Sequence, residues 1–225
     1  MIPAQLSRGC AYGKCTFCTY PSTEGAFRSL AASGAEASVR LAVTLGAEVS
    51  FKDSLLTSPL LKVAASLCIG RARWSGCTKL SRSLVDLMPT LARSGCSTLE
   101  LGLETLSENA QRLIDKRQSV GLLRDVLDAA AAHGVALVVN VITGFPGEDD
   151  DSQWLSLLAE EIARRSPRLT VKVERNKFQL ERRAPMAERP PFGLRVTGAW
   201  PWSSVLAWEM DVSPRGAARR LEVLP

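Results

Sequence analysis

The sequence has little histidine and no long hydrophobic run: His133 is the one histidine among 225 residues. A transmembrane helix needs about 18 or more consecutive apolar residues, so we expect neither a membrane span nor a membrane partner. The N-terminus also lacks the basic segment and apolar stretch of a secretory signal peptide. We therefore expect a cytoplasmic protein, whose six cysteines stay reduced and form no disulfide framework.

The composition is that of a globular protein, with 46% hydrophobic and 23% charged residues, which excludes a disordered chain. Its length fits one large domain or two small ones. The net charge of +5 is uneven, since residues 164–220 contain thirteen Lys or Arg against five Asp or Glu. Such a segment could bind an acidic peptide or a nucleic acid. We favour a solvated surface there and expect no nucleic-acid partner; Lys116 and Arg117 are likewise expected to be a solvated helix end.

Strand and helix patterns alternate along the chain. The predicted strands are 5–7, 47–52, 72–77, 97–103, 135–142 and 169–173, and the predicted helices are 34–45, 59–69, 83–94, 106–116, 122–134 and 149–165. This alternation favours parallel strands with right-handed crossovers, in a doubly wound sheet or a barrel. Because six units are fewer than the eight of a closed barrel, we expect an α/β fold that forms an open, partial (β/α)6 parallel barrel.

After Arg175 the alternation weakens, and several prolines interrupt it. We therefore divide the chain into a core, 1–178, and a short C-terminal extension, 179–225, which need not be complete. Three of the five tryptophans, Trp200, Trp202 and Trp208, lie in this extension, and we expect them to pack against the core.

Three cysteines, Cys10, Cys15 and Cys18, lie within nine residues, directly after the first predicted strand. Functional loops of parallel α/β folds follow the strands in this way. Three neighbouring thiolates can face one metal centre, and a 4Fe-4S cluster held by three cysteines keeps one iron open to a ligand. A zinc-stabilised domain is the alternative. Structural zinc requires four ligands, and His133, predicted to cap a helix, lies far away in the sequence.

The run Cys10-x4-Cys15-x2-Cys18, with an aromatic residue at Phe17, resembles the cluster loop of the radical S-adenosylmethionine (SAM) superfamily, whose common spacing is C-x3-C-x2-C. Further segments resemble that family in the expected order, namely Phe-Lys-Asp at 51–53, Leu-Gly-Leu-Glu-Thr at 101–105 and Val-Ile-Thr-Gly-Phe-Pro-Gly-Glu at 141–148. Segments 178–180, 184–186 and 191–193 resemble members that carry a cobalamin-binding domain. The resemblance covers about residues 4–195.

The resemblance implies an enzyme with a radical SAM core and two cofactors, a 4Fe-4S cluster and SAM. Cys10, Cys15 and Cys18 would ligate three irons, and SAM would chelate the fourth. With an electron from a donor protein, SAM would be cleaved to a 5′-deoxyadenosyl radical that abstracts hydrogen from the substrate. Five residues would contact SAM: Phe17 near the adenine, Asp53 and Glu104 at the ribose or amino group, and Ile142 and Gly144 through backbone at the adenine.

The resemblance also bears on the substrate and on cobalamin. It implies an unidentified substrate, such as a peptide or natural product, that is methylated or cyclised, and it assigns no catalytic side chain. The first predicted strand begins close to Met1, so we expect no N-terminal cobalamin domain. The chain would then be a truncated form, work without cobalamin, or obtain it from a separate protein. A truncated, non-catalytic remnant that acts as a binding module is a further alternative.

Overall fold

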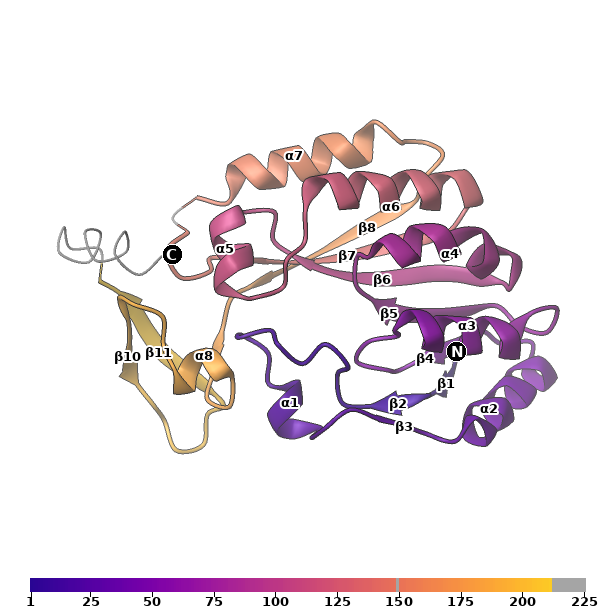
Figure 1. Cartoon of the computed structure of the whole chain (residues 1–225), viewed down its shortest axis with the longest axis horizontal. Coiled ribbons are helices and arrows are strands. Elements are labelled where there is room, and N and C mark those ends of the chain that lie inside the picture. Colours follow the sequence, from indigo (N-terminus) through magenta and orange to yellow (C-terminus); the bar gives the residue numbers. More distant parts are fainter. Residues whose placement is uncertain (149, 212–225) are drawn as a thin grey trace.

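In a computed structural model, which describes residues 1–148 and 150–211, six parallel strands form the main sheet (Figure 1). In spatial order they are β1 (Ile2–Ala4), β4 (Val49–Phe51), β5 (Trp74–Thr78), β6 (Cys96–Glu104), β7 (Ala136–Thr143) and β8 (Val171–Lys177). Each strand lies beside the next one along the chain, without the reversal of strand order found in a doubly wound sheet. The expected α/β fold with an open, partial barrel is confirmed.

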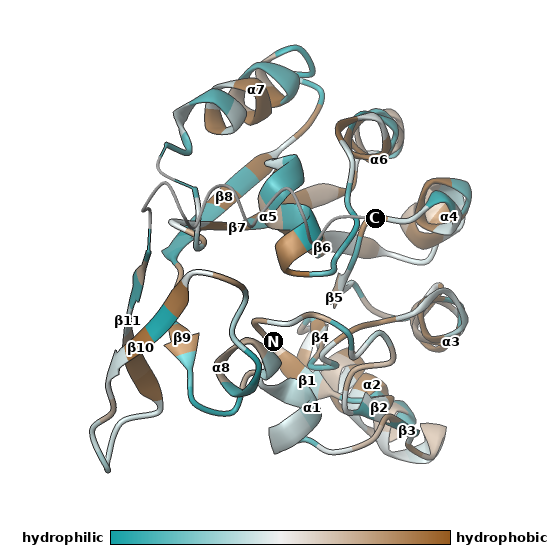
Figure 2. Ribbon diagram, turned by 60° about the vertical axis from the view of Figure 1, so that its left-hand side comes forward, coloured by the Kyte–Doolittle hydropathy of each residue, from teal (hydrophilic) through white to brown (hydrophobic). Residues whose placement is uncertain are grey.

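The connecting helices cover one face of the sheet. They are α2 (Ala32–Leu45), α3 (Ser58–Cys68), α4 (Arg82–Arg93), α6 (Val120–His133) and α7 (Ser152–Ala163), with a shorter α5 (Glu108–Leu113) before α6. Figure 2 shows α7, α6, α4, α3 and α2 in an arc around the outside of the curved sheet. No helix in the described part of the chain is long and apolar enough to cross a membrane.

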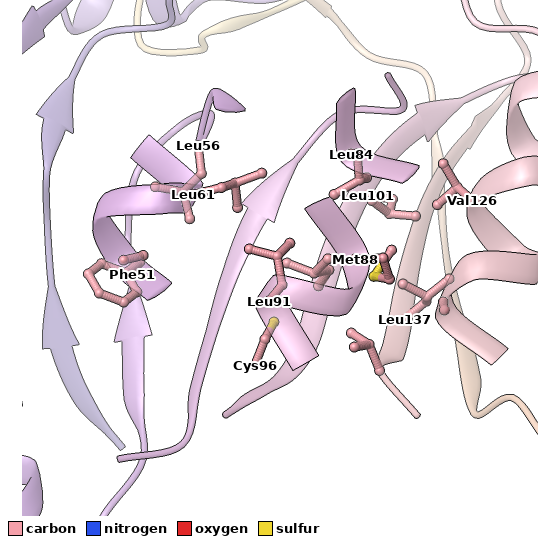
Figure 3. Close-up of a cluster of buried hydrophobic side chains, with 14 of the residues drawn as sticks. Phe51, Leu56, Leu61, Leu84, Met88, Leu91, Cys96, Leu101, Val126 and Leu137 are labelled. Atoms are coloured by element: carbon pink, nitrogen blue, oxygen red, sulfur yellow. The ribbon is translucent and has the colours of Figure 1, made fainter. Parts of the chain in front are cut away.

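The main core fills the space between these helices and the sheet (Figure 3). Phe51 and Leu101 of the strands meet Leu61, Met88 and Val126 of the helices there. Cys68 and Cys96 are buried in the same core. Because the helices occupy one face of the sheet, the opposite, concave face is left to line a site.

Helix ends follow their sequence signals. The Ser119 hydroxyl accepts a hydrogen bond from the Leu122 N–H at the start of α6, and Gly134 ends that helix in the left-handed conformation (φ 70°). Ser107 caps α5 in the same way, but α5 spans only Glu108–Leu113 instead of the predicted 106–116. The chain turns after α5 because Asp115 and Arg117 adopt left-handed conformations (φ 49° and 58°), which cannot continue an α-helix.

The first strand of the sheet is Ile2–Ala4 and not the predicted 5–7. Its ladder ends at Ala4 because the Leu6 N–H donates to the Asp53 carboxylate instead of to a neighbouring strand. Residues Ser7–Arg8 form a separate strand, β2, which pairs with β3 (Arg28–Ser29). The chain thereby leaves the sheet just before the cysteine loop.

The described part of the extension forms a small sheet in the order β10–β11–β9, with α8 beside it. The elements are β9 (Leu180–Glu181), α8 (Pro185–Glu188), β10 (Leu194–Gly198) and β11 (Val205–Met210). Trp208 packs against Phe178, with ring centroids 5.5 Å apart. Trp200 and Trp202 are instead 63% and 85% exposed, so the prediction that they pack on the core is wrong. Residues 149 and 212–225, which belong to the last predicted helix and the extension, lie outside the described residues.

Candidate functional site at the cysteine loop

A cavity of about 840 Å³ lies on the concave side of the sheet, beneath the cysteine loop. Its wall includes all three loop cysteines as well as Phe17, Asp53 and Glu104. Asp53 follows β4 and Glu104 ends β6, so both reach the cavity from the carboxyl ends of parallel strands, where α/β folds bind ligands. The structure therefore brings together six of the eight predicted site residues.

The cysteine loop is fastened to the segment that follows α5. The Thr16 N–H donates to the Ile114 carbonyl (3.1 Å), and the Thr16 hydroxyl donates to the Leu113 carbonyl (2.8 Å). The Tyr12 hydroxyl donates to the Asp115 carbonyl (2.5 Å). On its other side the loop binds the extension, because the Met186 N–H donates to the Thr16 carbonyl (2.7 Å). These contacts hold the three thiols against one cavity.

The thiols of Cys10, Cys15 and Cys18 are partly buried. Burial raises the pKa of Cys15 to about 11, while the positive charge of Lys116 acts in the opposite direction. In the described residues, no group of three His, Cys, Asp or Glu side chains is placed to hold a single metal ion. A 4Fe-4S cluster takes its cysteines at separate irons, so three thiols spread around one cavity fit the donor set of such a cluster.

Asp53 joins the end of β4 to the chain that leads into the cysteine loop. Its side chain is 3% exposed, and its two oxygens accept from the Leu6 N–H at 3.2 and 3.1 Å. The Ser7 hydroxyl donates to Oδ1 at 2.6 Å. Asp53 thus orders the approach to Cys10 through hydrogen bonds made by the protein itself. A contact between Asp53 and SAM stays a prediction.

Glu104 forms a buried ion pair with Lys116. Lys116 Nζ lies 2.5 Å from Glu104 Oε1, and both side chains are 11% exposed. The expectation that Lys116 is a solvated helix end is wrong, because the chain turns at Asp115 and directs Lys116 inward. Gly102 makes room for the pair, since a Cβ there would lie 2.6 Å from Lys116 Nζ.

The other predicted SAM contacts lie in different surroundings. The Phe17 ring lines the cavity and meets Phe145 edge-on, with ring centroids 5.8 Å apart. Ile142 packs against the second apolar cluster, around Phe145 and Phe178. The Gly144 N–H donates to Asp151 Oδ2 (2.7 Å). Within the described chain, neither Ile142 nor Gly144 lines the cavity, and their role at the adenine stays a prediction.

Sequence reasoning missed many further residues of the cavity wall, among them Lys116, Tyr20, Glu100 and Asn140. Asn140 gave a signal, since it is a polar residue within an otherwise apolar predicted strand. Glu100 gave a signal as well. Because successive strand residues alternate between faces, Glu100 lies on the face of β6 opposite to that of Leu99. The positions of Tyr20 and Lys116 depend on turns of the chain that no local sequence pattern predicts.

Replacing Gly9 with alanine is expected to lower the free energy of unfolding by about 1–3 kcal/mol and to reduce the iron bound per chain. Gly9 has φ +72°, and a Cβ there would lie 2.7 Å from the Gly25 carbonyl oxygen. Gly34→Ala is the matched control, because no atom other than those of its chain neighbours and its own helix backbone lies within 4 Å of its added Cβ in α2. Thermal unfolding and iron analysis measure both effects. A Gly9→Ala chain that matches Gly34→Ala in both would contradict this account.

Comparison with known proteins agrees with this geometry. A family model for the radical SAM superfamily matches residues 5–158, whereas no curated protein sequence matches significantly. The solved structures of similar fold include the radical SAM methyltransferase TsrM from Kitasatospora setae, with cobalamin and a 4Fe-4S cluster bound (TM-score 0.68, 14% identity, 88% of this chain and 42% of that chain). TsrM has also been solved with tryptophan substrate and aza-SAM (TM-score 0.65, 14% identity, 88% and 41%).

Two further structures share the fold. One is the cobalamin-dependent SAM radical enzyme OxsB with aqua-cobalamin bound (TM-score 0.65, 13% identity, 81% of this chain and 34% of that chain). The other is methylornithine synthase, PylB (TM-score 0.59, 15% identity, 83% and 55%). The chain spans less than half the length of TsrM and OxsB, and at these identities the likeness concerns the fold alone.

Proposed function

Because the chain belongs to the radical SAM superfamily, whose members use a 4Fe-4S cluster and SAM, we propose that it cleaves SAM reductively and directs the resulting 5′-deoxyadenosyl radical at a bound substrate. The observation that carries this proposal is the placement of three partly buried cysteine thiols on the wall of one cavity. The cluster, when bound, supplies the electron and an open iron for SAM.

The residues of the chain would hold and orient the two cofactors. Cys10, Cys15 and Cys18 would ligate three irons. Glu104 Oε1 is engaged by Lys116, which leaves the other carboxylate oxygen for the ribose or amino group of SAM. Asp53 would act through its bonds to Leu6 and Ser7, and the cavity wall would keep bulk water from a reactive radical.

The substrate and the reaction that follows SAM cleavage are also part of the proposal. We expect a peptide or natural product as substrate and methylation or cyclisation as the reaction, with an electron-donor protein as partner. The TsrM structures, which contain cobalamin in one case and tryptophan in another, support this choice by shared fold. Cobalamin is a further proposed cofactor, tested by adding it to the assay below.

The test is an anaerobic reconstitution with iron and sulfide, followed by SAM and a chemical reductant, with 5′-deoxyadenosine measured by mass spectrometry. The natural chain should form 5′-deoxyadenosine, and Cys15→Ala should form none because one iron loses its ligand. Cys68→Ala is the control for loss of a thiol, since Cys68 is buried in α3 away from the cavity, and it should retain cleavage. One zinc per chain without cleavage would support the zinc-stabilised domain instead, and neither metal nor cleavage would support the binding module.

A further inference from the structure

Polar side chains from the middle of the sheet line part of the cavity wall. Ser75 and Cys77 of β5, Thr98 and Glu100 of β6 and Asn140 of β7 all lie on its wall. The strand register sets Cys77 beside Glu100, and Gly102 beside Asn140. Where the interior of a barrel serves only as a packed core, large apolar side chains fill it. This polar part of the wall, in which Glu100 is exposed and the others are partly buried, therefore suits a ligand with polar groups of its own.

Glu100 differs from the other carboxylates that the strands bring to this wall. Asp53 accepts three hydrogen bonds from Leu6 and Ser7, Glu104 is paired with Lys116, and Glu48 lies 2.8 Å from the Arg73 guanidinium. The polar partner of Glu100 in residues 1–148 and 150–211 is the neutral amide of Asn140, whose Nδ2 donates to Oε1 at 2.6 Å. Its charge has no cationic partner there.

The cations of the wall are occupied or lie at its edge, as does Met1 with its α-ammonium, a residue that is 78% exposed. Lys116 is bound to Glu104. The Lys79 ammonium lies 3.6 Å from the centroid of the Tyr12 ring. Lys52 follows the end of β4 and is exposed. An unpaired carboxylate thus faces a cavity whose own cations are directed elsewhere.

Tyr20 adds an aromatic ring to the same region. It opens α1 (Tyr20–Thr23), two residues after Cys18, and lines the cavity. Its side chain is 47% exposed, so the ring is open to a ligand that enters the cavity. Carboxylates and aromatic rings both bind ammonium ions in proteins.

We propose that Glu100, oriented by Asn140, binds the protonated amine of the substrate with Tyr20 on the same cavity wall, and that the substrate is a small primary amine. This inference rests on the proposed function. Glu100 stands four residues before Glu104 on β6, which is roughly 13 Å along a strand. The amine would therefore lie below the end of the cavity where the cysteines and Glu104 meet SAM, with the carbon to be attacked between the two.

The test uses three probes that share an indole ring and a two-carbon chain and differ in charge: tryptamine, tryptophol and indole-3-propionate. Each is titrated calorimetrically into the reconstituted full chain with saturating SAM and no reductant, so that SAM fills its own site and is not consumed. Tryptamine should bind about tenfold or more tightly than tryptophol, and indole-3-propionate most weakly.

Glu100→Gln should abolish the preference for tryptamine while SAM affinity changes less than twofold. The glutamine oxygen can still accept from Asn140, so the fold is retained. Glu24→Gln removes a charge from another residue of the wall and should keep the preference. Equal binding of the three probes, binding of none, or a loss of SAM affinity in Glu100→Gln equal to that of tryptamine would each overturn the inference. Adding reductant separates the two proposals: absence of SAM cleavage contradicts the proposed function, whereas cleavage without amine preference contradicts only the amine site.

Discussion

Replacement of Lys116 by methionine is expected to lower the free energy of unfolding by about 3–5 kcal/mol, since it leaves a buried charge without its partner. For a chain of this size the corresponding fall in melting temperature is roughly 10 °C. Methionine keeps an unbranched apolar stem, so the loss reports the ammonium group. The Glu104 carboxylate, 11% exposed and 2.5 Å from Lys116 Nζ, would remain buried with no opposite charge.

The backbone around this pair adds to the expected effect. Glu104, Asp115 and Arg117 all have positive φ, at 66°, 49° and 58°, a conformation that is costly for residues other than glycine. The Lys116–Glu104 pair holds this segment in place, and the segment in turn accepts the hydrogen bonds of Thr16 and Tyr12. The Lys116→Met chain should therefore also bind less iron than the natural chain.

Two comparisons make the Lys116 prediction decisive, with chemical unfolding of each variant as the measurement. The double variant Glu104→Gln/Lys116→Met should recover part of the loss, because removing both charges relieves the unpaired one. Arg82→Met breaks an exposed pair with Asp125, whose side chains are 72% and 46% exposed, and should cost under about 1 kcal/mol. If Lys116→Met costs no more than Arg82→Met, the pair is not the buried interaction described here.

The features that the sequence predicted correctly are those with a local cause. The end of α6 at Gly134 depends on residues within one helical turn. The strand order followed from the alternation of strands and helices, because crossover connections leave few arrangements. The place of the cysteine loop at the carboxyl end of the sheet followed from that order.

The features that could not be predicted depend on contacts between distant segments. Lys116 and Glu104 are twelve residues apart, and they meet because the chain turns at Asp115 where it receives the Tyr12 hydroxyl. The first strand stops at Ala4 because Asp53, forty-seven residues from Leu6, takes the Leu6 N–H. No helical or strand period encodes either contact.

The apolar run 135–142 shows the limit of pattern arguments in another way. It is typical of a strand buried on both faces, and Leu137, Val139 and Val141 are indeed buried against the helices. Val138 and Asn140 instead line the cavity on the concave face. The barrel is open on that side, so alternate residues of this mostly apolar strand form part of the cavity wall. This outcome depends on the curvature of the whole sheet.

Replacement of Asp53 by alanine is expected to cost about 3 kcal/mol of folding stability, because it leaves the buried Leu6 N–H and the Ser7 hydroxyl without their charged acceptor. Asp53→Asn should cost less, since its side-chain oxygen can still accept from Leu6. Ser54→Ala, at the neighbouring residue on the same cavity wall, is the control and should change stability by less than about 0.5 kcal/mol.

The Asp53 variants also separate a role in positioning the loop from a direct contact with SAM. If Asp53 orders the path from Leu6 to Cys10, then Asp53→Ala should lose stability and iron even when no SAM is present, as measured by chemical unfolding and iron analysis. A residue that acted only on SAM would leave both values equal to those of Ser54→Ala and would weaken SAM binding alone. That result would contradict the positioning role, because the three hydrogen bonds of Asp53 exist without any ligand.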